Sequence, residues 1–251
     1  MLQSKGSARD HKWTREWVAW RTSLARARKG CQPMNSENLI AKERPYVVSG
    51  SLSLALFAAL SVLVVNGNMN AWNGAVCSNI ASLHSPALTS AMVFVSTMGS
   101  WFVYVPVILL LLVLPKTRMT AGLPVAVTMA ASELLNHALK LAFAIPRPDV
   151  HRLVQESGYG YPSGHAMNTL VFFGMCALVY AGGSQSKART AAALVVSSLY
   201  ALLMGFSRVY LGVHAPADVV AGYCAGVFVV SASQIVLHRT TGAVSRNAST
   251  S

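Results

Sequence analysis

The stretch Tyr46–Val65 reads YVVSGSLSLALFAALSVLVV and contains no charged side chain. The absence of charge continues well beyond it, since no Lys, Arg, Asp or Glu occurs between Pro45 and Pro115. Charge inside a bilayer is costly, and about 20 apolar residues are needed to cross the hydrocarbon as a helix. A lone strand cannot satisfy its backbone hydrogen bonds in lipid. The stretch therefore predicts an all-α membrane protein.

The composition of the whole chain supports this prediction. Of its 251 residues, 53% are hydrophobic and 11% are charged, whereas soluble domains average about 25% charged residues. We expect a basic N-terminal tail (1–45), one domain with six transmembrane helices (46–238) and a C-terminal tail (239–251). The predicted spans are Tyr46–Val65, Ser96–Leu114, Thr120–Leu139, Gly164–Gly182, Ala191–Phe206 and Pro216–Leu237.

The distribution of positive charge predicts the topology. The net charge is +12, and ten of the twenty Lys and Arg residues precede Pro45. Basic residues gather on the cytoplasmic side of membrane proteins. With both tails in the cytoplasm, every basic loop lies inside and the outer ends of spans three to six face the periplasm or the exterior. This pattern argues against a nucleic-acid partner. The loop and tail residues concerned are Lys116, Arg118, Lys187, Arg189, Arg239 and Arg246.

Two segments leave alternatives open. In the N-terminal tail, Trp13, Trp17 and Trp20 recur at helical spacing among basic residues, which is typical of an amphipathic helix on an anionic leaflet. A disordered basic tail and a translation start at Met34 are equal alternatives. The segment 66–95 reads either as a loop or as an interfacial stretch (76–87) followed by a short dipping helix (89–94).

A histidine and an aspartate stand at the start of the last predicted span. His214 and Asp218 are four residues apart, a spacing that helical geometry can place on one face. A carboxylate bound to one imidazole nitrogen fixes the tautomer and makes the other nitrogen a better nucleophile. We therefore predict that His214 attacks phosphorus, giving a phosphohistidine, and that Asp218 orients it.

A second cluster, Pro162-Ser163-Gly164-His165, precedes the fourth predicted span. A helix N-terminus offers free amide groups and a positive dipole to a phosphate. We expect Ser163 and the Gly164 amide to bind phosphate oxygens. His165 would protonate the leaving oxygen and later activate water. Taken alone, without the other two motifs, the same residues favour a simple helix cap beside an interfacial histidine.

Three cations complete the predicted site, namely Lys140, Arg147 and Arg208. Preorganised cations stabilise the charge that spreads over the equatorial oxygens of a phosphoryl transition state. Each could instead lie in the headgroup region on its own, but the three together with two histidines favour a phosphate site. Glu133 and His137 share a helical face with Lys140, so we expect Glu133 to pair with one of them.

These residues fall into three motifs. They are Lys140-x6-Arg147-Pro148, Pro162-Ser163-Gly164-His165 and Ser207-Arg208-x5-His214-x3-Asp218. Their types and spacing resemble the three signatures of the type 2 phosphatidic acid phosphatase superfamily, from Lys140 to Asp218. Many bacterial members have a second Arg-Pro pair where this chain reads Asp149-Val150, which puts headgroup preference in doubt.

The resemblance implies a lipid phosphatase in a cell (inner) membrane that acts on a lipid phosphate substrate without a metal or any cofactor. Undecaprenyl diphosphate ranks first among its implied substrates, ahead of phosphatidylglycerophosphate, phosphatidic acid and lipid A phosphates. A phosphotransferase using the same site is an alternative, and so is a transporter or an idle lipid-binding protein. The oligomeric state is left open.

Overall fold

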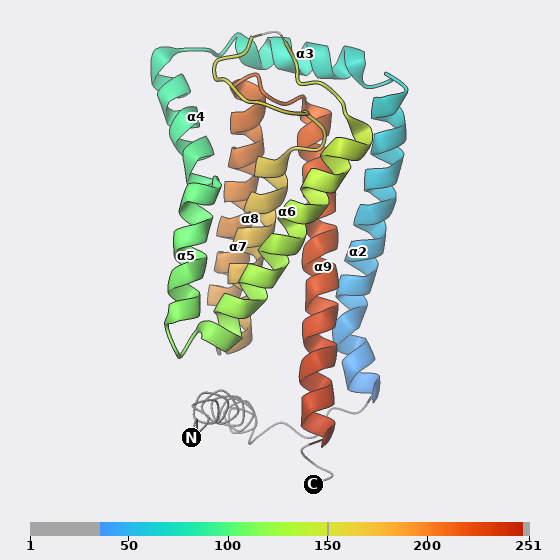
Figure 1. Cartoon of the computed structure of the whole chain (residues 1–251), viewed down its shortest axis with the longest axis vertical. Helices are drawn as coiled ribbons and strands as arrows, with labels where there is room; N and C mark the ends of the chain where they lie inside the picture. The colour runs from blue at the N-terminus through green and yellow to red at the C-terminus, as the bar shows by residue number, and fades with distance from the viewer. Residues whose placement is uncertain (1–35, 150, 248–251) are drawn as a thin grey trace, which may run out of the picture. The chain divides into compact units, whose positions relative to one another are not determined.

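The computed structural model describes residues 36–149 and 151–247, and within them it contains helices and no strands. The interpretations of the N-terminal tail concern residues outside this part of the chain. Figure 1 shows the arrangement. The helices are α2 (Ser36–Val65), α3 (Asn70–Ala81), α4 (Pro86–Met98), α5 (Trp101–Val113), the π-helix η1 (Arg118–Gly122), α6 (Leu123–Phe143), α7 (Gly164–Gly183), α8 (Lys187–Tyr210) and α9 (Pro216–Asn247).

Five of the described segments are long and apolar enough to cross a membrane: Leu39–Val65, Pro86–Val113, Gly164–Gly183, Lys187–Tyr210 and Pro216–Thr240. The prediction of an all-α membrane fold is therefore confirmed. The remaining predicted span corresponds to α6, which has 21 residues but is not among the five. Its apolar sequence is interrupted by Glu133, His137 and Lys140. The sixth span therefore stays a prediction.

The second span begins earlier than the sequence indicated. It runs from Pro86 rather than Ser96. Ser85 caps its first helix by accepting from the backbone N–H of Leu88 at 3.3 Å, and Pro86 suits the first helical position because it has no N–H to satisfy. Helix α4 ends where a Cβ on Gly99 would lie 2.0 Å from Cε of Met204. This close approach marks the break between α4 and α5.

The segment after the first span forms helix α3, which lies across the ends of its neighbours in Figure 1. The side-chain amide of Asn73, a residue of α3, contacts the start of the last span. The Asn73 Oδ1 accepts a hydrogen bond from the backbone N–H of Ala217 at 3.1 Å. That N–H belongs to the first turn of α9, where no intrahelical acceptor exists. Helix α3 therefore helps to cap the helix that carries Asp218.

The described residues belong to two compact units. The larger unit is Tyr46–Ser233, and the smaller one combines the residues through Pro45 with those from Gln234 onward. Within the smaller unit, Arg239 donates from Nε and Nη2 to the Glu43 carboxylate at 3.1 and 3.0 Å. Helix α9 continues to Asn247, beyond the span end predicted at Leu237. The predicted C-terminal tail therefore begins as helix.

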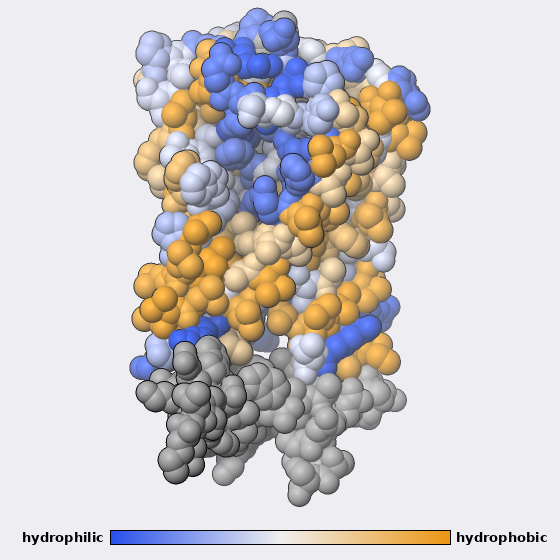
Figure 2. Space-filling view, viewed as in Figure 1, coloured by the Kyte–Doolittle hydropathy of each residue, from blue (hydrophilic) through white to orange (hydrophobic). Residues whose placement is uncertain are grey.

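The larger unit buries polar and apolar groups together around α7. Met167, Val171 and Met175 of this helix are fully buried. The Tyr104 hydroxyl of α5 lies 2.6 Å from Oγ1 of Thr169. On the outside, many large apolar side chains are exposed, including Leu56, Leu110 and Val196. Figure 2 shows a belt of hydrophobic residues in orange on one face, with hydrophilic residues gathered at the α3 end. So much exposed apolar surface is what a bilayer covers.

Candidate active site

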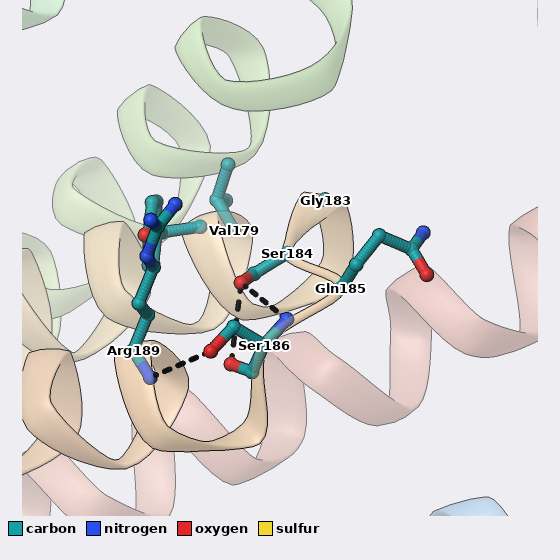
Figure 3. Close-up of a pocket in the computed structure, with 7 residues that line it drawn as sticks. Val179, Gly183, Ser184, Gln185, Ser186 and Arg189 are labelled. Carbon is teal, nitrogen blue, oxygen red and sulfur yellow. Dashed lines mark hydrogen bonds between the residues drawn. The ribbon is translucent and has the colours of Figure 1, made fainter.

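Two hollows of the larger unit differ in their lining, since motif residues line the second and not the first. The first, about 710 Å³, lies at the turn between α7 and α8. Figure 3 shows its lining, where Ser186 caps α8 by accepting from the Arg189 N–H at 3.3 Å. The second, about 610 Å³, lies among α5, α6 and α7. Its lining includes Lys140, Arg147, Gly164, His165 and His214. The candidate active site is therefore this second cavity.

His214 lies just before α9, in the turn that connects it to α8. Its Nδ1 is 3.3 Å from Oδ2 of Asp218, and both side chains are buried. The same Oδ2 accepts from the backbone N–H of Ala215 at 2.9 Å. A carboxylate at the third helical position commonly bonds back to the cap residue. The helix start therefore holds Asp218 against the histidine, although His214 itself precedes the helix instead of sharing its face.

The second ring nitrogen of His214 faces Arg147. The distance from Nε2 to Arg147 Nη1 is 3.1 Å. A guanidinium can only donate, so Nε2 accepts and the ring proton resides on Nδ1, toward Asp218. Burial, followed by the charges of Arg208, Arg147 and Lys140, lowers the pKa of His214 well below its usual range. The imidazole is neutral at pH 7, and its lone pair on Nε2 points to the cations.

Arg147 is held almost entirely by backbone carbonyls. Its Nε donates to Gly158 O at 3.1 Å, its Nη2 to Ser157 O at 3.1 Å, and its Nη1 to Val213 O at 3.0 Å. Lys140, near the end of α6, donates to Tyr159 O at 2.7 Å. The loop between the first and second motifs therefore wraps around both cations. Its carbonyl oxygens orient them in the absence of substrate.

The Pro-Ser-Gly-His cluster starts α7. Ser163 is the cap residue, and its Oγ accepts from the Ala166 N–H at 3.5 Å. Its backbone N–H donates to Asp218 O at 2.9 Å, which joins the starts of α7 and α9. A Cβ on Gly164 would lie 2.8 Å from Oδ1 of Asn136. A glycine therefore permits this close contact with α6, and His165 follows it into the cavity wall.

Arg208 is the most deeply buried of the three cations, with 1% exposure. Its Nη1 donates to the Ser96 hydroxyl and its Nη2 to Glu156 Oε1. Its Nε has no hydrogen-bond partner among the described residues. The structure thus brings Arg208 together with the other predicted site residues in one region of the larger unit. The roles predicted for these eight residues remain predictions.

Sequence reasoning missed Glu156. Besides Arg208, its carboxylate contacts Arg147 Nη2 at 3.6 Å, so one acid bridges two predicted phosphate-binding arginines. Burial alone would raise the pKa of Glu156, but the charge and hydrogen bond of Arg208 outweigh it and lower the pKa. Acidic residues are scarce after Pro45, where only four occur. That scarcity could have marked Glu156 as a candidate site residue. Its arginine partners could not be predicted, because Glu156 lies in a loop, where spacing along the chain does not indicate contacts.

Glu133 does not make the contact that the sequence suggested. It was expected to pair with His137 or Lys140 on its own helix. Instead, its Oε2 accepts from Nδ2 of Asn168 on α7 at 2.6 Å. Helices α6 and α7 pack together, and this packing brings the Asn168 amide within hydrogen-bond distance of the Glu133 carboxylate. The pairing prediction was wrong.

One prediction follows from the His214–Asp218 contact. Replacing Asp218 with Asn should lower kcat/KM by about 10²- to 10³-fold, since the amide no longer stabilises the proton on Nδ1. Arg147 still donates to Nε2 and opposes the wrong tautomer, so the loss should be smaller than that caused by removing His214. Phosphate release from the same lipid substrate measures both variants. Equal activity of Asp218→Asn and the unaltered protein would contradict the orienting role.

Comparison with known proteins extends these observations. Residues 121–241 match the model of the PAP2 superfamily. Phosphatidylglycerophosphatase B of Bacillus subtilis is 30% identical over 70% of this chain and 89% of its own length. Undecaprenyl-diphosphatase of Sulfolobus acidocaldarius is also 30% identical, over 70% and 85%.

Solved structures show the same fold. The crystal structure of a PAP2-type phosphatidylglycerolphosphate phosphatase from Bacillus subtilis superposes with a TM-score of 0.71 at 24% identity, covering 76% of this chain and 96% of that one. The crystal structure of Aquifex aeolicus LpxE gives 0.53 at 24% identity, with 63% and 92% covered. As the three motifs predicted, the chain belongs to the PAP2 superfamily.

Proposed function

We propose that this protein is a metal-independent lipid phosphatase of a cell membrane that forms a phosphohistidine on His214. The observation that carries this proposal is the environment of one imidazole. Nδ1 of His214 faces Asp218 at 3.3 Å and Nε2 faces Arg147 at 3.1 Å, in a buried setting. A neutral imidazole with its lone pair among cations is suited to attack a phosphorus atom whose oxygens those cations bind.

The reaction has two steps. In the first, Nε2 of His214 attacks phosphorus, the bond from phosphorus to the lipid oxygen breaks, and His165 gives a proton to that oxygen. In the second, His165 takes a proton from water, the water oxygen attacks phosphorus, and the N–P bond breaks to release phosphate. Lys140, Arg147 and Arg208 would stabilise the equatorial oxygens, together with Ser163 and the Gly164 amide.

The proposed orientation places the site on the periplasmic or outer face of the cell (inner) membrane, with both termini in the cytoplasm. It is supported by the two basic pairs within the larger unit. Lys116 and Arg118 follow α5, and Lys187 and Arg189 begin α8. Figure 1 places these turns at the ends of the helices opposite α3. Basic loops favour the cytoplasmic side.

The substrate class follows from the cavity and the relatives. The cavity joins cationic residues at one end to apolar ones such as Ile108 and Met129, which suits a phosphate carried on a lipid. The two relatives are named for phosphatidylglycerophosphate and for undecaprenyl diphosphate. Both a lipid phosphate and a lipid diphosphate are therefore candidates, with undecaprenyl diphosphate the one expected from resemblance.

The test is phosphate release by the purified protein in detergent with EDTA present. The lipids are undecaprenyl diphosphate, phosphatidylglycerophosphate and phosphatidic acid. Release from at least one of them is expected, and the His214→Ala variant should not release phosphate. A need for added Mg²⁺ or Zn²⁺ would contradict the metal-independent mechanism. Products that form only when an acceptor alcohol is added would instead identify a phosphotransferase.

A further inference from the structure

A second group of polar side chains lies in the cavity beyond the motif residues. The Asn168 amide is fixed at both ends: Oδ1 accepts from the Ser132 hydroxyl at 2.6 Å, and Nδ2 donates to Glu133 Oε2 at 2.6 Å. Ser132 is fully buried, whereas Glu133 and Asn168 line the cavity. The amide therefore holds a carboxylate in one position on the cavity wall, where neither the family motifs nor the proposed chemistry uses it.

The residues that helix α6 contributes to the cavity lining change in polarity along the helix. Lys140 lies at the cationic end, Glu133 seven residues before it, and Ala126 seven residues before that. A helix rises 1.5 Å per residue, so each step is about 10 Å. Near Ala126 the lining becomes apolar, with Val105 and Ile108 contributed by α5. The order is cation, carboxylate and amide, then hydrocarbon.

The carboxylate lies on the leaving-group side of the site. Asn168 follows His165 by three residues on α7, so the two side chains are neighbours on one helix face, about 4.5 Å apart along the axis. His165 is the residue proposed to protonate the leaving lipid oxygen. This step of the argument rests on the proposed function. The atoms just beyond that oxygen, on the way to the apolar end, then lie near Asn168 and Glu133.

We propose that Glu133, positioned by Asn168, selects lipid phosphomonoesters over lipid diphosphates. In a diphosphate the group beyond the leaving oxygen is a second phosphate, and a fixed carboxylate nearby repels it. In a monoester that group is an uncharged carbon chain or a hydroxyl, and a carboxylate oxygen accepts a hydrogen bond from a hydroxyl. Like charges repel at short range, and the hydrogen bond to Asn168 keeps the Glu133 carboxylate from turning away. The inference opposes the substrate ranked first from resemblance.

The experiment compares two probes that differ only in the second phosphate, farnesyl phosphate and farnesyl diphosphate. Initial rates in detergent give kcat/KM for each, with the first product separated by chromatography. Glu133→Gln keeps an acceptor for Asn168 and removes the charge. It should raise the diphosphate-to-monoester ratio of kcat/KM by about tenfold. The matched control is Lys187→Gln, which also removes one charge, because Lys187 is exposed at the start of α8 and does not line this cavity, and its ratio should equal that of the unaltered protein.

The ratio does not depend on how much of each preparation is folded, so a poorly expressed variant still gives an answer. An unchanged ratio in Glu133→Gln would overturn the inference, as would an unaltered protein that prefers the diphosphate. Failure of the proposed function has a different signature, since the unaltered protein would then release phosphate from neither probe, and the selectivity inference would fall with it.

Discussion

Replacing His214 with Ala should lower lipid phosphate release by about 10⁴-fold or more, because no other group supplies the nucleophile. The structure leaves no substitute at that position. His214 is 1% exposed, and its neighbours are Arg147 and Asp218. The guanidinium cannot act as a nucleophile, and the carboxylate is oriented to the helix start. Phosphate release and transfer of labelled phosphate to the protein would be measured together, and both should vanish.

The matched control for this variant is His151→Asn. His151 lies in the loop before the second motif, its side chain is exposed, and its φ is 60°. Asn tolerates such a backbone conformation, so this change removes an imidazole without straining the loop. The control should retain activity. Labelled protein in His214→Ala, or a loss of turnover of less than about tenfold, would exclude His214 as the nucleophile.

Replacing His165 with Ala should lower hydrolysis of a lipid alkyl phosphate by about 10³-fold, within the range that general acid–base catalysis contributes. The lipid alcohol is a poor leaving group unless it receives a proton as the bond breaks. His165 lies at the N-terminus of α7, beside Gly164, and lines the same cavity as His214. Loss of the imidazole removes both proton transfers and leaves the nucleophile intact.

An aryl phosphate separates the two proton transfers, since a nitrophenolate leaves without protonation. With p-nitrophenyl phosphate, His165→Ala should release one equivalent of nitrophenolate rapidly and then stall, because water is no longer activated. The phosphohistidine should accumulate and be stable to base but labile to acid. If the first equivalent is as slow as with an alkyl phosphate, His165 acts on phosphate binding instead of on proton transfer.

Local sequence was sufficient for part of the site. The pair His214 and Asp218 was found because both groups lie at one helix start, where four residues of separation bring them together. The cap role of Ser163 is likewise local, because its side chain accepts a hydrogen bond from the backbone N–H of Ala166, three residues later. Lys140, in the last turn of α6, and Arg147, in the following loop, stand out as charges at the edge of an apolar span, but the sequence does not reveal their carbonyl partners.

Two of the contacts that sequence reasoning missed join distant segments. Glu156 meets Arg208, 52 residues later, and Glu133 meets Asn168, 35 residues later. Gly99, at the break between α4 and α5, likewise lies against Met204 of another helix. In each case the partner is chosen by which helices pack side by side, and no periodicity within one segment carries that information.

The amino-acid sequence by itself determined that this chain is a helical membrane protein, and it predicted which histidines, cations and carboxylate form its site. The physical reason is that hydrocarbon excludes charge, so the few polar residues in and beside the spans stand out. Only the tertiary structure decided which of those residues touch. It placed Glu156 between two arginines and Glu133 against Asn168, because close packing of helices brings side chains into contact irrespective of their distance along the chain.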